Sequence, residues 1–262
     1  MKKREYILLR LIEEYIQRPE PISSAKLREN LDIDISSATI RYYFKQLTDA
    51  GALQKTHISS GRIPTLVSLR EFWKTRLQED LEIEVSAELD LEEVAQQKQI
   101  FCEYYVLQNK PLSHVERYRD FLVVVFEDVE FVVPYNKNLE RFLKSQIGKK
   151  AFDLAKDCYE IGLVRFSKNL KEFLKKGFKM CAVDEAVELS SDSREWASRH
   201  LPKLFDGTML YEGSEGVRFY NNLLSYKFRI KDNDLKGEML LVGKVYRDFE
   251  GFINRIKGEK HG

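Results

Sequence analysis

The chain has few cysteines and no long apolar run, and each of these absences excludes a class of protein. Its 262 residues include three cysteines, six prolines and four histidines. The cysteines, at positions 102, 158 and 181, are odd in number and widely spaced; they form no metal-binding pattern and suit a reducing compartment. No apolar run approaches the roughly 18 residues that cross a bilayer. We therefore expect a cytoplasmic protein with no membrane span, no metal and no cofactor.

Signatures of catalysis and of secretion are also missing. The sequence contains no P-loop, no G-x-S-x-G and no H-E-x-x-H, and its cysteines have no histidine close by in sequence. The opening residues, MKKREYILLRLIEEY, are interrupted by charges at Glu5, Arg10, Glu13 and Glu14, which is typical of an amphipathic helix rather than a signal peptide. We do not expect an enzyme.

The charge is distributed unevenly along the chain. Residues 1–78 hold 14 Lys and Arg against nine Asp and Glu, a net charge of +5, whereas the remainder holds 29 against 33, a net charge of −4. A basic segment on a mildly acidic body is typical of an anion-binding module on a carrier, although a bias this small also arises by chance.

The first 78 residues predict three helices, a hairpin and a fourth helix. Ser23 or Ser24 can cap the second helix, and Ser36 or Ser37 the third, which runs to Gly51. Residues 53–58 predict a strand, 59–61 a tight turn, Arg62-Ile63 the start of the return strand, and 66–77 a helix capped by Thr65. Two helices joined by a short turn and followed by a hairpin indicate a winged helix-turn-helix.

The rest of the chain predicts an α+β domain with an antiparallel sheet. An acidic connector enters an expected long helix over residues 88–107. Apolar runs at 121–127 and 129–134 predict two strands. Further expected elements are helical stretches at 139–176 and 193–201, a hairpin formed by residues 226–230 and 238–245, and a closing amphipathic helix at 247–258.

The third helix is the candidate for reading DNA. On a helical wheel Ile40, Phe44 and Leu47 form the buried stripe, and Tyr42 lies opposite. A recognition helix presents its N-terminal residues to base edges, and a hairpin arginine can lie over the backbone or minor groove. An ordinary solvated face with an incidental arginine is the alternative. The predicted DNA-binding residues are Ser36, Ser37, Ala38, Thr39, Arg41, Tyr42 and Lys45 in the helix and His57, Ser60 and Arg62 in the hairpin.

Two motifs in this region resemble those of a known family. The run Ser-Ser-Ala-Thr-Ile-Arg spans Ser36 to Arg41, and Thr-His-Ile-Ser-Ser-Gly-Arg-Ile-Pro-Thr spans Thr56 to Thr65. Together they resemble the DNA-binding domain of the bacterial heat-inducible transcription repressors called HrcA. A weaker similarity extends to the closing segment from Leu235. The chain departs from the family in having Tyr42-Tyr43 after the arginine, and in being shorter, which we assign to residues 150–215.

This resemblance implies a fold and a function. It implies a winged helix-turn-helix over residues 1–78 and a GAF-like dimerisation and regulatory domain over 79–262, with an inserted dimerisation segment. It also implies a homodimeric repressor that binds an inverted repeat in double-stranded DNA upstream of chaperone genes, with the chaperonin as the partner that keeps it active.

Two alternatives remain open from the sequence. The chain could be a winged-helix regulator controlled by a small effector bound in the GAF-like domain, or a winged helix used only for protein contacts. The segments LFDGTMLY and EGFINRI could contribute to a dimer interface, although each by itself is more typical of a core.

Overall fold

The computed structural model has a mixed α+β fold and divides into two compact units. Unit 1 comprises Met1–Glu103, Met180–Phe228 and Met239–Gly262, and unit 2 comprises Tyr104–Lys179 and Arg229–Glu238. In the part of the chain that the structure describes, no helix is long and apolar enough to cross a bilayer. The structure describes residues 3–55, 61–79, 81–85, 89–107, 110–127, 129–174, 179–192, 194–232 and 235–258.

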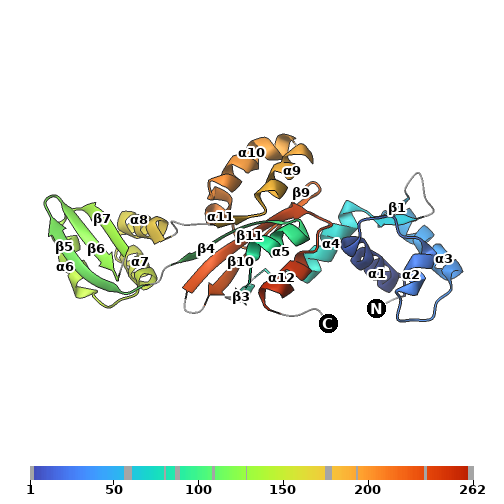
Figure 1. Cartoon of the computed structure of the whole chain (residues 1–262), viewed down its shortest axis with the longest axis horizontal. Helices are drawn as coiled ribbons and strands as arrows, with labels where there is room; N and C mark the ends of the chain where they lie inside the picture. Colours follow the sequence, from blue (N-terminus) through green and yellow to red (C-terminus); the bar gives the residue numbers. More distant parts are fainter. Residues whose placement is uncertain are drawn as a thin grey trace. The chain divides into compact units, whose positions relative to one another are not determined.

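Three helices open unit 1 and share one apolar core (Figure 1). They are α1 (Lys3–Gln17), α2 (Ser24–Glu29) and α3 (Ser37–Asp49). The expected caps are confirmed, because the hydroxyls of Ser23 and Ser36 each accept a backbone N–H three residues on. The fully or nearly buried side chains of this core are Ile7, Leu11, Ile22, Leu27, Ile35, Ile40, Phe44, Leu47 and Leu53.

A short hairpin and a fourth helix complete this part of unit 1. Strand β1 (Leu53–Lys55) pairs antiparallel with β2 (Arg62–Pro64). Helix α4 (Leu66–Arg76) follows, and Thr65 caps it by accepting the backbone N–H of Ser68. The strand pair and the capped helix agree with the sequence-based expectation for this region.

The larger sheet has the strand order β3-β10-β11-β4-β8, with β9 pairing on β10. Its strands β4, β10 and β11 begin or end in unit 1 and continue in unit 2. Helices α5 and α12 pack against each other, and α9, α10 and α11 form a separate layer in unit 1 (Figure 1). The bounds are β3 (Glu82–Glu84), β4 (Phe101–Leu107), β8 (Lys179–Cys181), β9 (Gly216–Tyr220), β10 (Leu223–Asp232), β11 (Leu235–Lys244), α5 (Leu91–Lys98), α9 (Val183–Asp192), α10 (Arg194–Phe205), α11 (Thr208–Glu212) and α12 (Phe249–Ile256).

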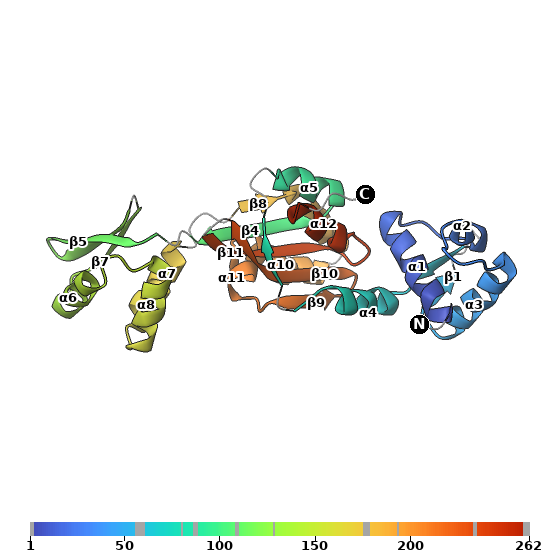
Figure 2. The ribbon, with the colours of Figure 1, turned by 90° about the horizontal axis from the view of Figure 1, so that it is seen from below.

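Unit 2 contains a three-stranded antiparallel sheet covered on one face by helices. Strands β5 (Leu112–Tyr118), β6 (Phe121–Phe126) and β7 (Val129–Pro134) pair in sequence order. Figure 2 shows α6, α7 and α8 on one side of this sheet. On that side Phe131 packs its ring 5.7 Å from Phe166 and 5.0 Å from Phe173. The helices are α6 (Lys137–Ser145), α7 (Ala151–Glu160) and α8 (Val164–Leu174).

The other face of the unit 2 sheet carries exposed apolar side chains. Tyr118 is 61% exposed, Phe121 48% and Val132 54%. The register pairs Tyr118 with Phe121 and Val123 with Val132, so all four side chains lie on one face. We call Tyr118, Phe121 and Val132 the apolar face of unit 2. Contiguous exposed apolar side chains can mark an interaction surface.

The prediction of one long helix over residues 88–107 is wrong. Helix α5 ends at Lys98, and Gln99 adopts a left-handed conformation with φ of 52°, after which the chain enters β4. The expected helical stretch at 139–176 consists of three helices, interrupted at Gly148 and Gly162, which have φ of +89° and +85°. The strands expected at 121–134 and 226–245 and the closing helix are confirmed.

The two segments considered for a dimer interface belong to the core where their side chains are described. In α12 the side chains of Phe252, Ile253 and Ile256 are buried, and before it Leu204 and Leu210 are buried as well. These apolar side chains therefore stabilise the fold of unit 1 rather than offering a free surface.

Candidate nucleic-acid interface

The first turn of α3 is fixed by its own N-terminal serine. The Ser36 hydroxyl accepts the backbone N–H of Thr39 over 3.1 Å, and the two hydroxyl oxygens lie 2.9 Å apart. Such a cap satisfies one of the free N–H groups of the first turn and leaves others available to an anion. Ser36 is exposed, whereas Ser37 and Thr39 are half-buried. These three predicted residues therefore lie together at the start of one helix.

The middle of α3 presents an exposed polar face. Because Ile40, Phe44 and Leu47 face the core, the side chains of Ala38, Arg41, Tyr42 and Lys45 point away from it and are exposed. This is the face that the helical period predicted. We call Ala38, Arg41, Tyr42 and Lys45 the α3 face.

Tyr42 is the largest exposed side chain on this face, with 59% of its surface exposed. Its hydroxyl accepts a hydrogen bond from Nε2 of Gln46 over 2.8 Å, and its ring centroid lies 5.7 Å from that of Tyr43. These contacts hold the ring in one orientation on the helix surface. The phenol can still donate its own proton to an outside acceptor.

Arg62 begins the return strand of the hairpin, as the sequence predicted, and its side chain contacts α3. Its backbone exchanges hydrogen bonds of 2.9 Å with Ile22 in both directions. Its side chain is half-buried, with Nε donating to the Thr48 hydroxyl over 3.3 Å and Nη1 to the Gly61 carbonyl over 3.1 Å. The register of the hairpin pairs Arg62 with Lys55 and so sets Arg62 within β2.

The hairpin adds a cation that the sequence analysis missed. Lys55 is exposed and lies directly opposite Arg62 in the β1–β2 register. Residues directly opposite in an antiparallel pair have neighbouring side chains, so the pair concentrates positive charge next to α3. Counting back from Arg62 across the hairpin could have identified Lys55. The predicted contacts His57 and Ser60 lie outside the described residues.

Comparison with known proteins identifies the family. A model of the HrcA C-terminal domain matches residues 73–260.

The chain belongs to the HrcA family.

Among its relatives, the heat-inducible transcription repressor HrcA of Helicobacter pylori is 26% identical over 271 residues, which span 99% of this chain and 96% of the relative. The heat-inducible transcription repressor HrcA of Chlamydia trachomatis is 46% identical over 70 residues, or 27% of this chain and 18% of the relative. A crystal structure described as a hypothetical protein aligns with a TM-score of 0.51 at 18% identity, covering 99% of this chain and 98% of the other. That likeness concerns the fold alone.

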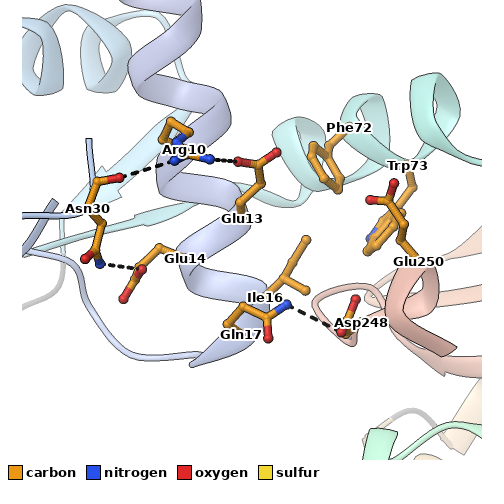
Figure 3. Close-up of a pocket in the computed structure, with 10 residues that line it drawn as sticks. All are labelled: Arg10, Glu13, Glu14, Ile16, Gln17, Asn30, Phe72, Trp73, Asp248 and Glu250. Carbon is orange, nitrogen blue, oxygen red and sulfur yellow. Dashed lines mark hydrogen bonds and ion pairs between the residues drawn. The ribbon is translucent and has the colours of Figure 1, made fainter. Parts of the chain in front are cut away.

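A second polar region in unit 1 of this HrcA family member is unsuited to DNA. A cavity of about 330 Å³ lies where α1 and α4 meet the start of α12 (Figure 3). Four carboxylates line it, from Glu13, Glu14, Asp248 and Glu250, with Arg10 as the cationic lining residue. Carboxylates repel phosphate, so we do not count this cavity in the nucleic-acid interface.

The same region joins α4 to the rest of unit 1. The indole N–H of Trp73 donates to the Val245 carbonyl over 2.6 Å, and its ring lies 5.6 Å from that of Phe249 in an edge-on arrangement. The Arg76 guanidinium contacts Glu13 over 2.7 Å and Glu250 over 3.4 Å. These buried and half-buried contacts hold α4 in place within unit 1. Helix α4 follows directly on the hairpin, so they also fix where the hairpin ends.

Proposed function

We propose that the chain is a homodimeric transcription repressor of chaperone genes, which binds an inverted repeat in double-stranded DNA and acts by binding rather than by catalysis. In this proposal residues 1–78 form a winged helix-turn-helix. Residues 79–262 form a GAF-like regulatory and dimerisation domain with an inserted dimerisation segment. Membership of the HrcA family and the names of its relatives as heat-inducible transcription repressors support this.

The observation that carries the proposal is the α3 face beside the capped start of α3. A helix of this kind enters the major groove with its N-terminal residues at the base edges. Arg41 can bond a guanine, Tyr42 can donate to a base, and the small Ala38 allows close approach and contact with a thymine methyl. Lys45 lies further along α3 and suits a phosphate. The first-turn N–H groups, next to Ser37 and Thr39, add anion affinity.

The hairpin extends the surface that can meet the DNA backbone. Lys55 and Arg62 are cross-strand neighbours, and Arg62 contacts α3 through Thr48. In the proposal these cations neutralise phosphates next to the groove that α3 occupies, together with the predicted contacts His57 and Ser60. Each phosphate neutralised releases counterions and makes binding depend on salt.

Dimerisation follows from the needs of specificity and has a candidate surface. One small module reads only a few base pairs, so a useful preference for one operator generally needs two modules. The apolar face of unit 2 has the exposed side chains that a pairing surface requires, on a sheet whose other face is covered by helices. A two-fold pair of chains would then present two α3 helices to the two halves of an inverted repeat.

The chaperonin is the partner that we propose for regulation in the cytoplasm. A chain with large apolar cores exposes them when partly unfolded, and such species are the ones that chaperones capture. In the proposal the free chaperonin keeps the repressor folded. Heat diverts the chaperonin to other clients and so relieves repression.

The proposal is tested by DNA binding of the full chain as salt is varied. Fluorescence anisotropy with a labelled duplex carrying the inverted repeat should give an affinity that falls steeply with salt, and Arg41→Ala should weaken it. Arg194→Ala removes the same charge from an exposed position on α10 and serves as the matched control. A module used only for protein contacts would show neither the salt dependence nor a difference between the two variants.

A further inference from the structure

A second cavity in unit 1, distinct from the α3 face, has the lining of an anion site. It measures about 190 Å³ and lies between the β9–β10 hairpin and helices α10 and α11. Three cationic side chains line it, from Lys203, Arg218 and Lys227. Among the described residues of its lining none carries a carboxylate, and hydroxyls come from Thr208, Ser214, Tyr220 and Ser225.

The strand register explains how these groups converge. Strand β10 pairs with β9 so that Ser225 lies opposite Arg218 and Lys227 lies opposite Gly216. Alternate residues of a strand share a face, so Ser225 and Lys227 point to the same side as Arg218 and Tyr220. Lys203 comes from α10. The cavity is therefore built by the β9–β10 hairpin together with α10 and α11, and not by a single loop.

The deepest cation of the cavity is a buried and firmly held lysine. Lys227 is 4% exposed, and its ammonium donates to the carbonyls of Leu210, over 2.5 Å, and Gly213, over 2.9 Å. Ser225 beside it is 3% exposed. Burying a cation is costly unless hydrogen bonds and neighbouring charges compensate it, so this position of Lys227 is a built feature of the cavity.

A buried carboxyl, that of Glu103, interacts electrostatically with Lys227. Glu103 is fully buried, and neither of its carboxylate oxygens has a hydrogen-bond partner in the described part of the chain. Burial, and next the charge of Asp206, raise the pKa of Glu103 to about 8, although Lys227 opposes the shift. The carboxyl is then mostly protonated near neutral pH and adds little negative charge beside the cavity.

We propose that this cavity binds a small oxyanion, a ligand with a carboxylate or phosphate group, between Lys203, Arg218 and Lys227. Charged donors and hydroxyls in a half-enclosed site form short, strong hydrogen bonds to such oxygens. The volume lies below that of usual drug-sized pockets, which selects a metabolite-sized anion. The sequence left open a regulator that is controlled by a small effector. The cavity supplies a binding site for such an effector and a chemical class for it.

The same hairpin also contacts α4, which offers a route from the cavity to the DNA-binding part. Strand β9 turns Arg218 and Tyr220 to the cavity, while Phe219 between them lies under the Arg70 guanidinium, 5.8 Å from its ring centroid. Arg70 also donates to the Asn221 carbonyl over 2.5 Å. An anion that binds Arg218 would therefore contact β9, the strand that packs against α4. This effect on DNA rests on the proposed function, whereas binding in the cavity does not.

The binding step is tested by calorimetric titration of the full chain with inorganic phosphate and, separately, with malonate, at constant ionic strength. We expect saturable binding of at least one probe, and the tighter of the two identifies phosphate or carboxylate as the preferred group. Arg218→Gln should weaken it at least about tenfold, the loss of one charge-assisted hydrogen bond. Arg194→Gln on α10 should leave it unchanged.

A second variant, checked for folding, distinguishes loss of the anion site from unfolding of the protein. Lys227→Met should abolish binding, and circular dichroism checks that α11 survives, because Lys227 holds two carbonyls at its end. If neither probe binds saturably, or if Arg218→Gln and Arg194→Gln bind alike, the site does not exist. Anisotropy on operator DNA with and without the bound probe tests the coupling. An unchanged DNA affinity would overturn the coupling, and failure of DNA binding without any probe would contradict the proposed function instead.

Discussion

Arg62 in β2 donates a hydrogen bond from Nε to the hydroxyl oxygen of Thr48 in α3, over 3.3 Å. Thr48 in turn donates to the Phe44 carbonyl over 2.7 Å, so its hydroxyl is oriented by the helix itself. The hairpin arginine is thus held at the side of the helix that we propose reads DNA.

Replacing Arg62 with alanine should weaken binding to every DNA sequence. If Arg62 neutralises one phosphate, the slope of log affinity against log salt should flatten by about one unit. Thr48→Val keeps the charge but removes the acceptor, so it should alter affinity less than Arg62→Ala. Anisotropy over a salt series measures both variants. An unchanged affinity and slope in Arg62→Ala would remove the hairpin arginine from the interface.

Replacing Tyr42 with alanine should lower specificity without unfolding the protein. The side chain is 59% exposed and lies opposite the buried stripe, so its loss leaves no cavity. If Tyr42 contacts a base, the operator should lose about 1–3 kcal/mol of its preference over scrambled DNA. Tyr42→Phe keeps the ring and removes the hydroxyl, which separates stacking from hydrogen bonding. Equal losses on operator and scrambled DNA would rule out base reading.

Gly61 should resist substitution because of a close approach to the backbone. A Cβ at this position would lie 2.8 Å from the Cβ and 2.9 Å from the carbonyl carbon of Pro21. Gly61→Ala should therefore cost about 1–3 kcal/mol in the free energy of unfolding, as overpacking does. Gly51→Ala is the comparison, since Gly51 has φ of +72° but open space around it. Urea unfolding measures both, and a Gly61→Ala protein as stable as the wild type would contradict the packing.

Glu103 should make the protein less stable as pH rises. Its ordinary pKa of 4.5 applies to the unfolded chain, while burial first, and then Asp206, raise the folded pKa to about 8. Between about pH 4.5 and pH 8 the unfolded chain binds fewer protons than the folded one, so the contribution of Glu103 to stability falls through this window and levels off above it.

Glu103→Gln should remove that pH dependence. At pH 8.5 the variant should be more stable than the wild type by an amount on the order of a few kcal/mol, and at pH 4.5 the two should differ little. Glu84→Gln, at an exposed position of β3, is the control. Urea unfolding at both pH values is the measurement. Parallel pH profiles for wild type and Glu103→Gln would show that the buried carboxyl does not titrate as described.

A charge on the apolar face of unit 2 should separate the proposed dimer. Val132→Lys adds a cation to an exposed position of β7 beside Phe121 and Tyr118, which should weaken association of two chains. Val187→Lys makes the same change at a position of α9 that is 51% exposed. Sedimentation velocity should show a monomer only for Val132→Lys. If both variants remain dimers, the copies pair through another surface.

Local signals in the sequence were sufficient to predict helix α3 and its exposed face. The serine before α3, the glycine after it and the apolar period of Ile40, Phe44 and Leu47 act within a few residues of one another, and each is found in the structure as expected. The hydrogen bonds that hold Arg62 beside α3 could not be predicted, because their partners Ile22 and Thr48 are remote from it in sequence.

The elements after residue 79 were harder to predict, because they too depend on contacts between residues remote in sequence. Strand β4 lies between β11 and β8, and Phe101, Cys102 and Glu103 are all buried, so the alternation that marks a strand is missing. The end of α5 carries no glycine, because Gln99 adopts the left-handed conformation itself. In β5 a shift of register between Leu112 and His114 breaks the period of two. The cavity lined by Arg218 and Lys227 depends on how α10 and α11 pack against the β9–β10 hairpin, which no local signal in the sequence predicts.

We propose that two copies of this chain repress chaperone genes by binding an inverted repeat, and nuclease footprinting detects that binding on the DNA itself. The full chain is added to DNA from upstream of the chaperone genes of its own organism, and protection from nuclease is mapped on both strands. We expect two symmetric protected half-sites, centred a whole number of helical turns apart. Uniform, salt-sensitive protection without a defined site, or protection of a single half-site at saturation, would contradict it.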